Sequence, residues 1–211
     1  MIIYGSFKSL FIIDALTILV TMDTKYLESV KKQFAYYKQL GEKAIHQIDD
    51  RALFWQYNEE SNSIAIIVKH LWGNMLSRWT DFLTTDGEKD FRDRDGEFAP
   101  TIATKEELVK KWEAGWQVLF QAVNNLQNEQ LADTIYIRNM GHTVTEAINR
   151  QLAHYAYHVG QIVYIARMSV GNDWQSLSIP KGQSKIYNQE KFAQPKRIQH
   201  FTDEFLDTQK S

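Results

Sequence analysis

The chain has 211 residues, of which 44% are hydrophobic and 13% aromatic, and its formal net charge is -2. A chain of this length buries one good core and does not require a second domain. The near-neutral charge and the lack of a dense Lys/Arg block argue against nucleic acid or a membrane as a partner. Because the sequence holds no cysteine, disulfides and thiolate sites are excluded, which fits a cytoplasmic protein.

Residues 1–21 form an apolar leader of uncertain status. The runs Leu10–Ile13 and Ala15–Val20 are separated by an aspartate, and a membrane span needs about 20 apolar residues. The segment also lacks the clear basic start and small-residue cleavage site of a secretory signal. Met22 precedes the first strong helical pattern, so translation from Met22 is another interpretation. We expect residues 22–171 to fold as one domain without the leader.

Two long helices are expected in the first 83 residues. The first begins near Asp23 and repeats apolar residues at helical spacing, at Leu27, Val30, Phe34, Tyr37, Ala44 and Ile48. The second runs from Ile64 to about Leu83, with cap candidates in residues 59–63. Its core stripe is Ile64, Val68, Leu71, Met75, Trp79 and Phe82. A neighbouring stripe carries His70 and Asn74, which places both at the edge of the core.

Residues 84–103 are charged and rich in turn residues, and no period persists in them. Their acidic side chains do not fit the positions of an EF-hand loop. We interpret this long connection as a solvated loop, with a lid over a site as the alternative. A capping box from Thr104 to Glu107 then predicts a third helix, and residues 134–138 alternate like a short strand.

The fourth helix is predicted from Thr143 to Met168. Thr143 and Glu146 form a capping box at its start, and Gly171 is a plausible stop. His154 and His158 are four residues apart, so they share one face and lie about 6 Å apart along the axis. Such a pair is a weak metal signal by itself, and the glutamate of a zinc-protease helix is replaced by tyrosine. A third ligand has to come from elsewhere in the fold.

These patterns favour an all-α protein built as a four-helix bundle. Residues 172–211 are polar and are expected to form an extended tail, packed on the bundle or partly disordered. In such a bundle, metal sites form from inward side chains on facing helices. His70 on the second helix can therefore meet the histidine pair on the fourth.

The sequence around these histidines resembles the DinB/YfiT-like superfamily of metalloenzymes. The likeness is carried by Ile-Val-Lys-His70-Leu-Trp and by His154-Tyr-Ala-Tyr-His158-Val-Gly-Gln-Ile, and it covers about residues 22–170. The phrases that start at Asn58 and Leu177 look like one uncharacterised bacterial branch of it. The resemblance implies a DinB-like bundle in which His70, His154 and His158 bind a divalent metal.

The ligand type and the spacing of nearby polar residues indicate what could surround the metal. Three imidazoles suit zinc, nickel, iron(II) and copper alike, and we expect zinc or nickel, with iron as a further candidate. Asn74 and Gln161 are candidates to orient a ligand or to reach a bound water, or they are plain polar residues of the bundle. An open fourth position on the metal would favour catalysis.

Several functions stay open at this stage. Characterised relatives of the superfamily include S-transferases and isomerases in which a metal activates a low-molecular-weight thiol such as bacillithiol or mycothiol. The resemblance thus implies a small-molecule substrate, and the missing cysteine is compatible because the cosubstrate brings the nucleophile. The alternatives are a metal-dependent hydrolase and a non-catalytic metal- or ligand-binding protein of a stress response. A homodimer is also open.

Overall fold

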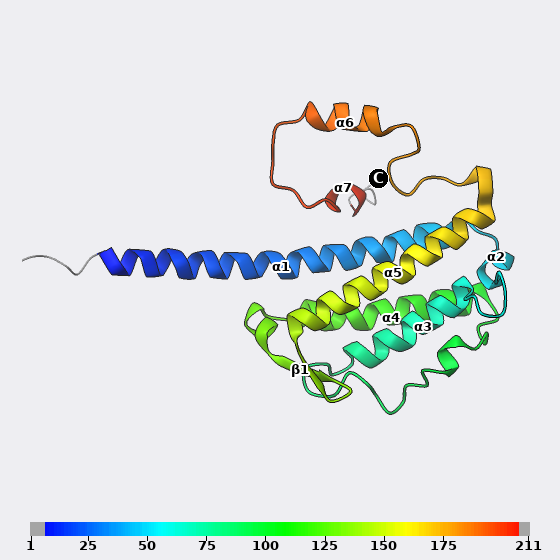
Figure 1. Cartoon of the computed structure of the whole chain (residues 1–211), viewed down its shortest axis with the longest axis horizontal. Coiled ribbons are helices and arrows are strands. Elements are labelled where there is room, and N and C mark those ends of the chain that lie inside the picture. The colour runs from blue at the N-terminus through cyan, green and yellow to red at the C-terminus, as the bar shows by residue number, and fades with distance from the viewer. Residues whose placement is uncertain (1–6, 207–211) are drawn as a thin grey trace, which may run out of the picture.

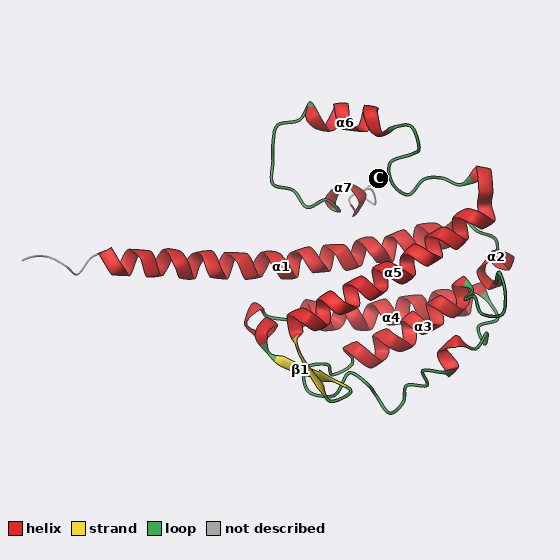
Figure 2. Ribbon diagram, viewed as in Figure 1, coloured by secondary structure: helices red, strands yellow, loops and turns green. Residues whose placement is uncertain are grey.

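The protein is mostly helical, which confirms the all-α class, and its described residues include a small two-stranded sheet (Figures 1 and 2). The computed structural model describes residues 7–206. In chain order its elements are α1 (Phe7–His46), α2 (Asp50–Phe54), α3 (Ile64–Trp79), η1 (Gly96–Phe98), α4 (Lys105–Asn125), η2 (Asn128–Ala132), β1 (Thr134–Ile137), β2 (Met140–Thr143), α5 (Val144–Val170), η3 (Gly171–Asp173), α6 (Ser184–Phe192) and α7 (Asp203–Leu206).

The helix starts follow the capping residues in the sequence. Ser63, Thr104 and Thr143 each accept a hydrogen bond from the backbone N–H three residues later. At Thr143 the bond is reciprocal, because the Glu146 carboxylate accepts from the Thr143 backbone N–H. These bonds satisfy donors that the first helical turn leaves free. The predicted starts of α3, α4 and α5 are therefore confirmed.

The core lies between α1, α3, α4 and α5. Helix α3 packs mainly on α4 and α1 mainly on α5, while α3 also contacts α5 (Figure 1). The apolar stripes predicted from the sequence supply this core, in which Phe34, Trp116 and Tyr155 are fully buried. The contact between α3 and α5 matters for function, because these two helices carry the candidate ligands.

A hairpin precedes α5 and holds part of the long connection. Strands β1 and β2 pair antiparallel, with Ile137 opposite Met140. The turn residues Arg138 and Asn139 have φ angles of 55° and 61°, the left-handed conformation that a tight two-residue hairpin turn requires. The Asp86 carboxylate accepts their two backbone N–H groups at 2.8 and 2.9 Å. The start of the connection after α3 is thereby fixed to the hairpin.

Two helix boundaries differ from the expectation. Helix α1 begins at Phe7 instead of Asp23, so the described part of the leader continues the first helix, and its N-terminal part extends past the packed helices (Figure 1). The leader's first six residues lie outside the described part of the chain. Helix α3 ends at Trp79 rather than near Leu83, because the next residues leave the helical conformation and Asp81 has a φ of 47°. Within residues 7–206, no helix has the length and apolar character of a membrane span.

The tail after Gly171 is not simply extended, because it forms α6 and α7 and returns to α1 (Figure 1). Ser29 lies 3.0 Å from the His200 ring, and the Lys32 ammonium donates to Asp203 at 2.6 Å. The Tyr36 ring contacts the rings of Phe201 and Phe205. The last part of the tail therefore contacts α1.

Candidate metal centre

The structure brings the three predicted histidines together. His70 lies in the middle of α3 and is 5% exposed, while His154 and His158 lie one turn apart on α5. The Nε2 atom of His154 is 3.2 Å from Nε2 of His70 and 3.1 Å from Nε2 of His158. One nitrogen from each ring lies within 4.8 Å of the other two. Three nitrogen donors from two helices therefore surround one point.

The apolar stripes of α3 and α5 explain this placement. Each histidine is followed by a residue of the core, namely Leu71, Tyr155 and Val159, which are 1%, 0% and 0% exposed. Successive residues of a helix are turned by roughly 100°, so each imidazole flanks the buried stripe instead of filling it. Packing α3 against α5 thus turns the three flanking positions toward one another.

Hydrogen bonds orient two of the three rings. Nδ1 of His70 lies 2.9 Å from the Glu97 carboxylate, and Nδ1 of His158 lies 2.7 Å from Oε1 of Gln161. These oxygens only accept, so each Nδ1 carries a proton, and in the neutral form of each ring Nε2 presents its lone pair to the centre. This is the arrangement by which metal-binding histidines are usually held.

The third ring completes a donor set that suits a cation. Nε2 of His154 has at most one proton to share between two lone pairs, and its buried Nδ1 has no partner among the described residues. No neutral tautomer of His154 therefore satisfies all the ring nitrogens. A divalent ion would accept the three Nε2 lone pairs at once, as three-histidine zinc sites do. The residues present fit such an ion.

Lowered pKa values keep the two histidines of α5 neutral. Burial, and then the nearby His158 and His70, lower the pKa of His154 to about 3. Burial, and then His70, lower the pKa of His158 to about 4, although the bond to Gln161 raises it slightly. Both rings are therefore neutral near pH 7, and a neutral imidazole is the form that binds metals.

Glu97 belongs to this centre and was not predicted from the sequence. It lies 27 residues after His70, in η1, and is 5% exposed. Burial alone would raise the pKa of Glu97, but hydrogen bonds from His70 and Arg92 and the charge of Arg92 lower it below its usual value. The interpretation of the connection as a solvated loop is wrong for Arg92 and Glu97, because both side chains are buried.

The two residues predicted near the ligands have different surroundings. Gln161 contacts His158 directly and orients its ring. Asn74 instead accepts a hydrogen bond from the Tyr155 hydroxyl at 3.0 Å, and that hydroxyl accepts one from Nε1 of Trp79 at 2.9 Å. Asn74 therefore joins α3 to α5 beside the histidines.

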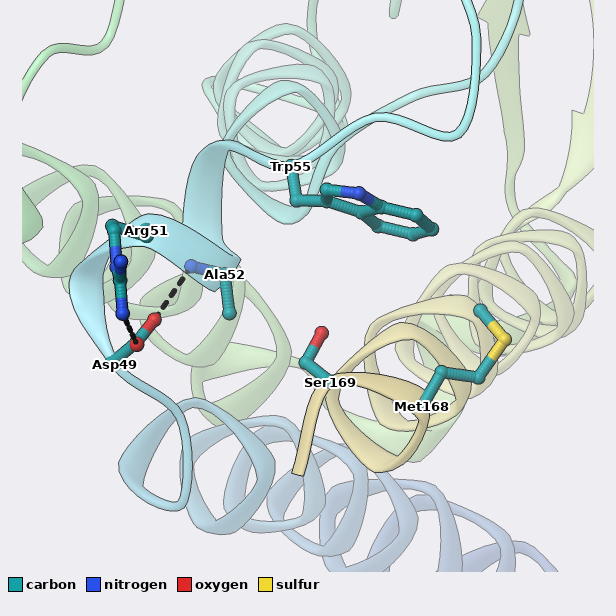
Figure 3. Close-up of a pocket in the computed structure, with 6 residues that line it drawn as sticks. All are labelled: Asp49, Arg51, Ala52, Trp55, Met168 and Ser169. Atoms are coloured by element: carbon teal, nitrogen blue, oxygen red, sulfur yellow. Dashed lines mark hydrogen bonds and ion pairs between the residues drawn. The ribbon is translucent and has the colours of Figure 1, made fainter. Parts of the chain in front are cut away.

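A separate hollow of about 520 Å³ lies near the C-terminal end of α5 (Figure 3). Trp55, which follows α2, and Met168 and Ser169 on α5 line it together with Asp49, Arg51 and Ala52. Met168 is ten residues beyond His158, or about 15 Å along the helix axis. This hollow is distinct from the histidine centre.

Comparison with known protein families supplies the affiliation of the chain. A family model described as "Protein of unknown function (DUF1572)" matches residues 21–183, a range that includes the three histidines and Glu97. No curated protein matches the sequence. Because the match covers most of the 211 residues, the chain belongs to the family of unknown function DUF1572.

Proposed function

We propose that this protein is a divalent-metal-dependent enzyme with a DinB-like four-helix bundle. The observation that carries the proposal is the convergence of three Nε2 atoms, two of which have their lone pairs directed inward by Glu97 and Gln161. Zinc or nickel is the proposed ion, with iron(II) as a further candidate, because imidazole ligands suit all three. The resemblance around His70 and His154 supports the DinB-like assignment.

A divalent ion held by three imidazoles would act as a Lewis acid and lower the pKa of a thiol or water bound in an open position. The chain itself contributes neutral rings, fixed tautomers and a site that is partly closed to water. The Phe98 ring stacks on His70 with centroids 4.9 Å apart, and the Tyr157 ring contacts His158. These two aromatic side chains are partly exposed and flank the centre.

The proposed reaction is transfer of a low-molecular-weight thiol to a small electrophile. The thiol loses its proton to solvent, its sulfur forms a bond to an electrophilic carbon, and the leaving group departs with the electron pair of the broken bond. The sequence supplies no cysteine, so the sulfur nucleophile has to arrive with the cosubstrate. This chemistry is supported by the resemblance to the superfamily and by the ligand set.

Metal analysis of the purified protein tests the proposal first. We expect about one divalent ion per chain in the wild type and loss of most of it in His154→Ala, because two imidazoles hold an ion weakly. His46→Ala is the control, since His46 is exposed at the end of α1 and its loss should leave the metal content unchanged. Equal metal content in wild type, His70→Ala and His154→Ala would exclude the site.

A product assay then distinguishes thiol transfer from hydrolysis. The metal-loaded protein is incubated with an electrophile such as chlorodinitrobenzene and with bacillithiol, mycothiol or glutathione, in water enriched in oxygen-18. A thioether that requires both the metal and His154 supports thiol transfer. A product that contains oxygen-18 and forms without thiol would instead identify a hydrolase.

A further inference from the structure

The segment between α3 and α4 folds back onto α3 and closes one side of the histidine centre. Helix η1 within this segment contacts α3. The Lys69 ammonium donates to the carbonyls of Gly96 and Ala99 at 2.6 and 3.2 Å and to the Thr101 hydroxyl at 2.6 Å. These bonds hold residues 96–101 beside the helix turn that carries His70.

Glu97 is held in place from two sides. Its two carboxylate oxygens accept from Nε and Nη2 of Arg92 at 2.8 and 3.0 Å, while one of them also contacts Nδ1 of His70 at 2.9 Å. The side chains of Arg92 and Glu97 are only 2% and 6% exposed. A bidentate pair with this little exposure has a well-defined geometry. The carboxylate is therefore fixed relative to the His70 ring.

A glycine on α3 makes this close approach possible. Gly73 lies three residues after His70, and a Cβ atom built at Gly73 would overlap the Glu97 carboxylate. Any larger residue at this position would displace the carboxylate from His70. Gly160 on α5 is different, because a Cβ atom there would meet nothing within 4 Å.

We propose that Glu97 is the positioning residue for His70. Arg92 holds its carboxylate, and the missing side chain of Gly73 leaves room for it. Metal binding at His70 and packing of residues 92–99 therefore stabilise each other. The inference rests on the proposed metal centre. A cation at Nε2 polarises the Nδ1–H group and strengthens its bond to a carboxylate. By thermodynamic linkage, an ion that strengthens this contact binds more tightly when the contact is formed.

A second carboxylate, that of Glu88, connects Arg92 to residues nearer the surface. Glu88 lies 3.7 Å from Nη1 of Arg92 and also pairs with Arg78 at 3.2 Å and with Arg138 at 3.0 Å. Arg138 sits in the turn of the β1–β2 hairpin. A chain of ion pairs thus runs from Arg138 through Glu88 and Arg92 to Glu97, which contacts His70.

The test compares zinc affinities measured by competition with a chromophoric chelator. Loss of a hydrogen-bond partner of a ligand typically weakens metal binding by about 10–100-fold, and we expect this range for Glu97→Gln and for Gly73→Ala. Gly160→Ala is the matched control and should bind zinc as the wild type does. Circular dichroism and thermal unfolding verify that each variant is folded.

Hydrogen exchange of the wild type provides a measurement that needs no variant. Zinc should slow amide exchange in residues 92–99, and Glu97→Gln should lose this protection. The proposal is overturned if zinc binds the wild type without slowing exchange there, or if folded Glu97→Gln and Gly73→Ala keep wild-type affinity. A wild type that binds no zinc, nickel or iron would reject the metal centre as well, which distinguishes the two failures.

Discussion

Two irregular segments return to the helical core, and they do so in opposite ways. The connection between α3 and α4 buries one of its ion pairs, since the side chains of Arg92 and Glu97 are 2% and 6% exposed. The tail after α5 keeps its charges near water, since those of Lys32 and Asp203 are 44% and 24% exposed. Buried pairs are costly to break, whereas exposed pairs contribute little. The first segment also reaches the histidines directly, because Glu97 contacts His70.

The largest expected effect comes from breaking the buried pair. Arg92→Ala leaves the buried Glu97 carboxylate without its arginine partner, and removing one member of a buried ion pair costs about 3–5 kcal/mol. Urea denaturation of the metal-free protein should show a loss of about this size in the free energy of unfolding. A loss under about 1 kcal/mol would mean that the pair behaves like a surface pair.

The pH dependence of the free energy of unfolding tests how deeply the two histidines of α5 are buried. The pKa values of His154 and His158 lie at about 3 and about 4 in the folded chain, against about 6.5 in an unfolded one. Between pH 6.5 and about 4 the unfolded chain binds more protons, so stability from these residues is present above pH 6.5 and falls as the pH drops.

The measurement is urea denaturation of metal-free protein at several pH values between 7 and 4.5. The wild type should lose stability more steeply with falling pH than the double variant His154→Asn/His158→Asn. The difference between the two curves removes the contribution of the carboxylates. Parallel curves would show that the two rings are not buried as neutral groups.

The smallest effect on the free energy of unfolding is expected from the tail. Lys32→Ala removes the pair with Asp203, and exposed pairs of this kind contribute about 0.2–1 kcal/mol. Zinc affinity should not change, because the contact lies on α1 and α7, outside the described centre. A zinc affinity lowered tenfold would show that the tail does influence the site and would remove the contrast between the segments.

Local patterns predicted much of the fold. The hydroxyls of Ser63, Thr104 and Thr143 mark helix starts because capping depends on residues three apart. The approach of His154 and His158 follows from helical geometry. The resemblance, together with the position of His70 beside its apolar stripe, indicated the third member. These predictions needed no knowledge of distant contacts.

The contacts of the connection between α3 and α4 were not predictable in this way. Glu97 is one of many acidic residues in its segment, and no spacing relates it to His70. What distinguishes it is the steric fit at Gly73 and the pairing with Arg92, which appear only when the segment folds back. The helices of the tail were not predicted either. Helix α6 buries no residue, so no apolar stripe marks it in the sequence.

The polar chain from Trp79 through Tyr155 to Asn74 has a consequence for the alignment of α3 and α5. Apolar stripes repeat with every turn, so hydrophobic contact alone would tolerate a slide of one helix past the other by about 5.4 Å. Directional hydrogen bonds do not tolerate such a slide, since it would leave buried polar groups without partners. The Tyr155 hydroxyl therefore fixes the position of α3 along α5, and with it the distance between His70 and His154.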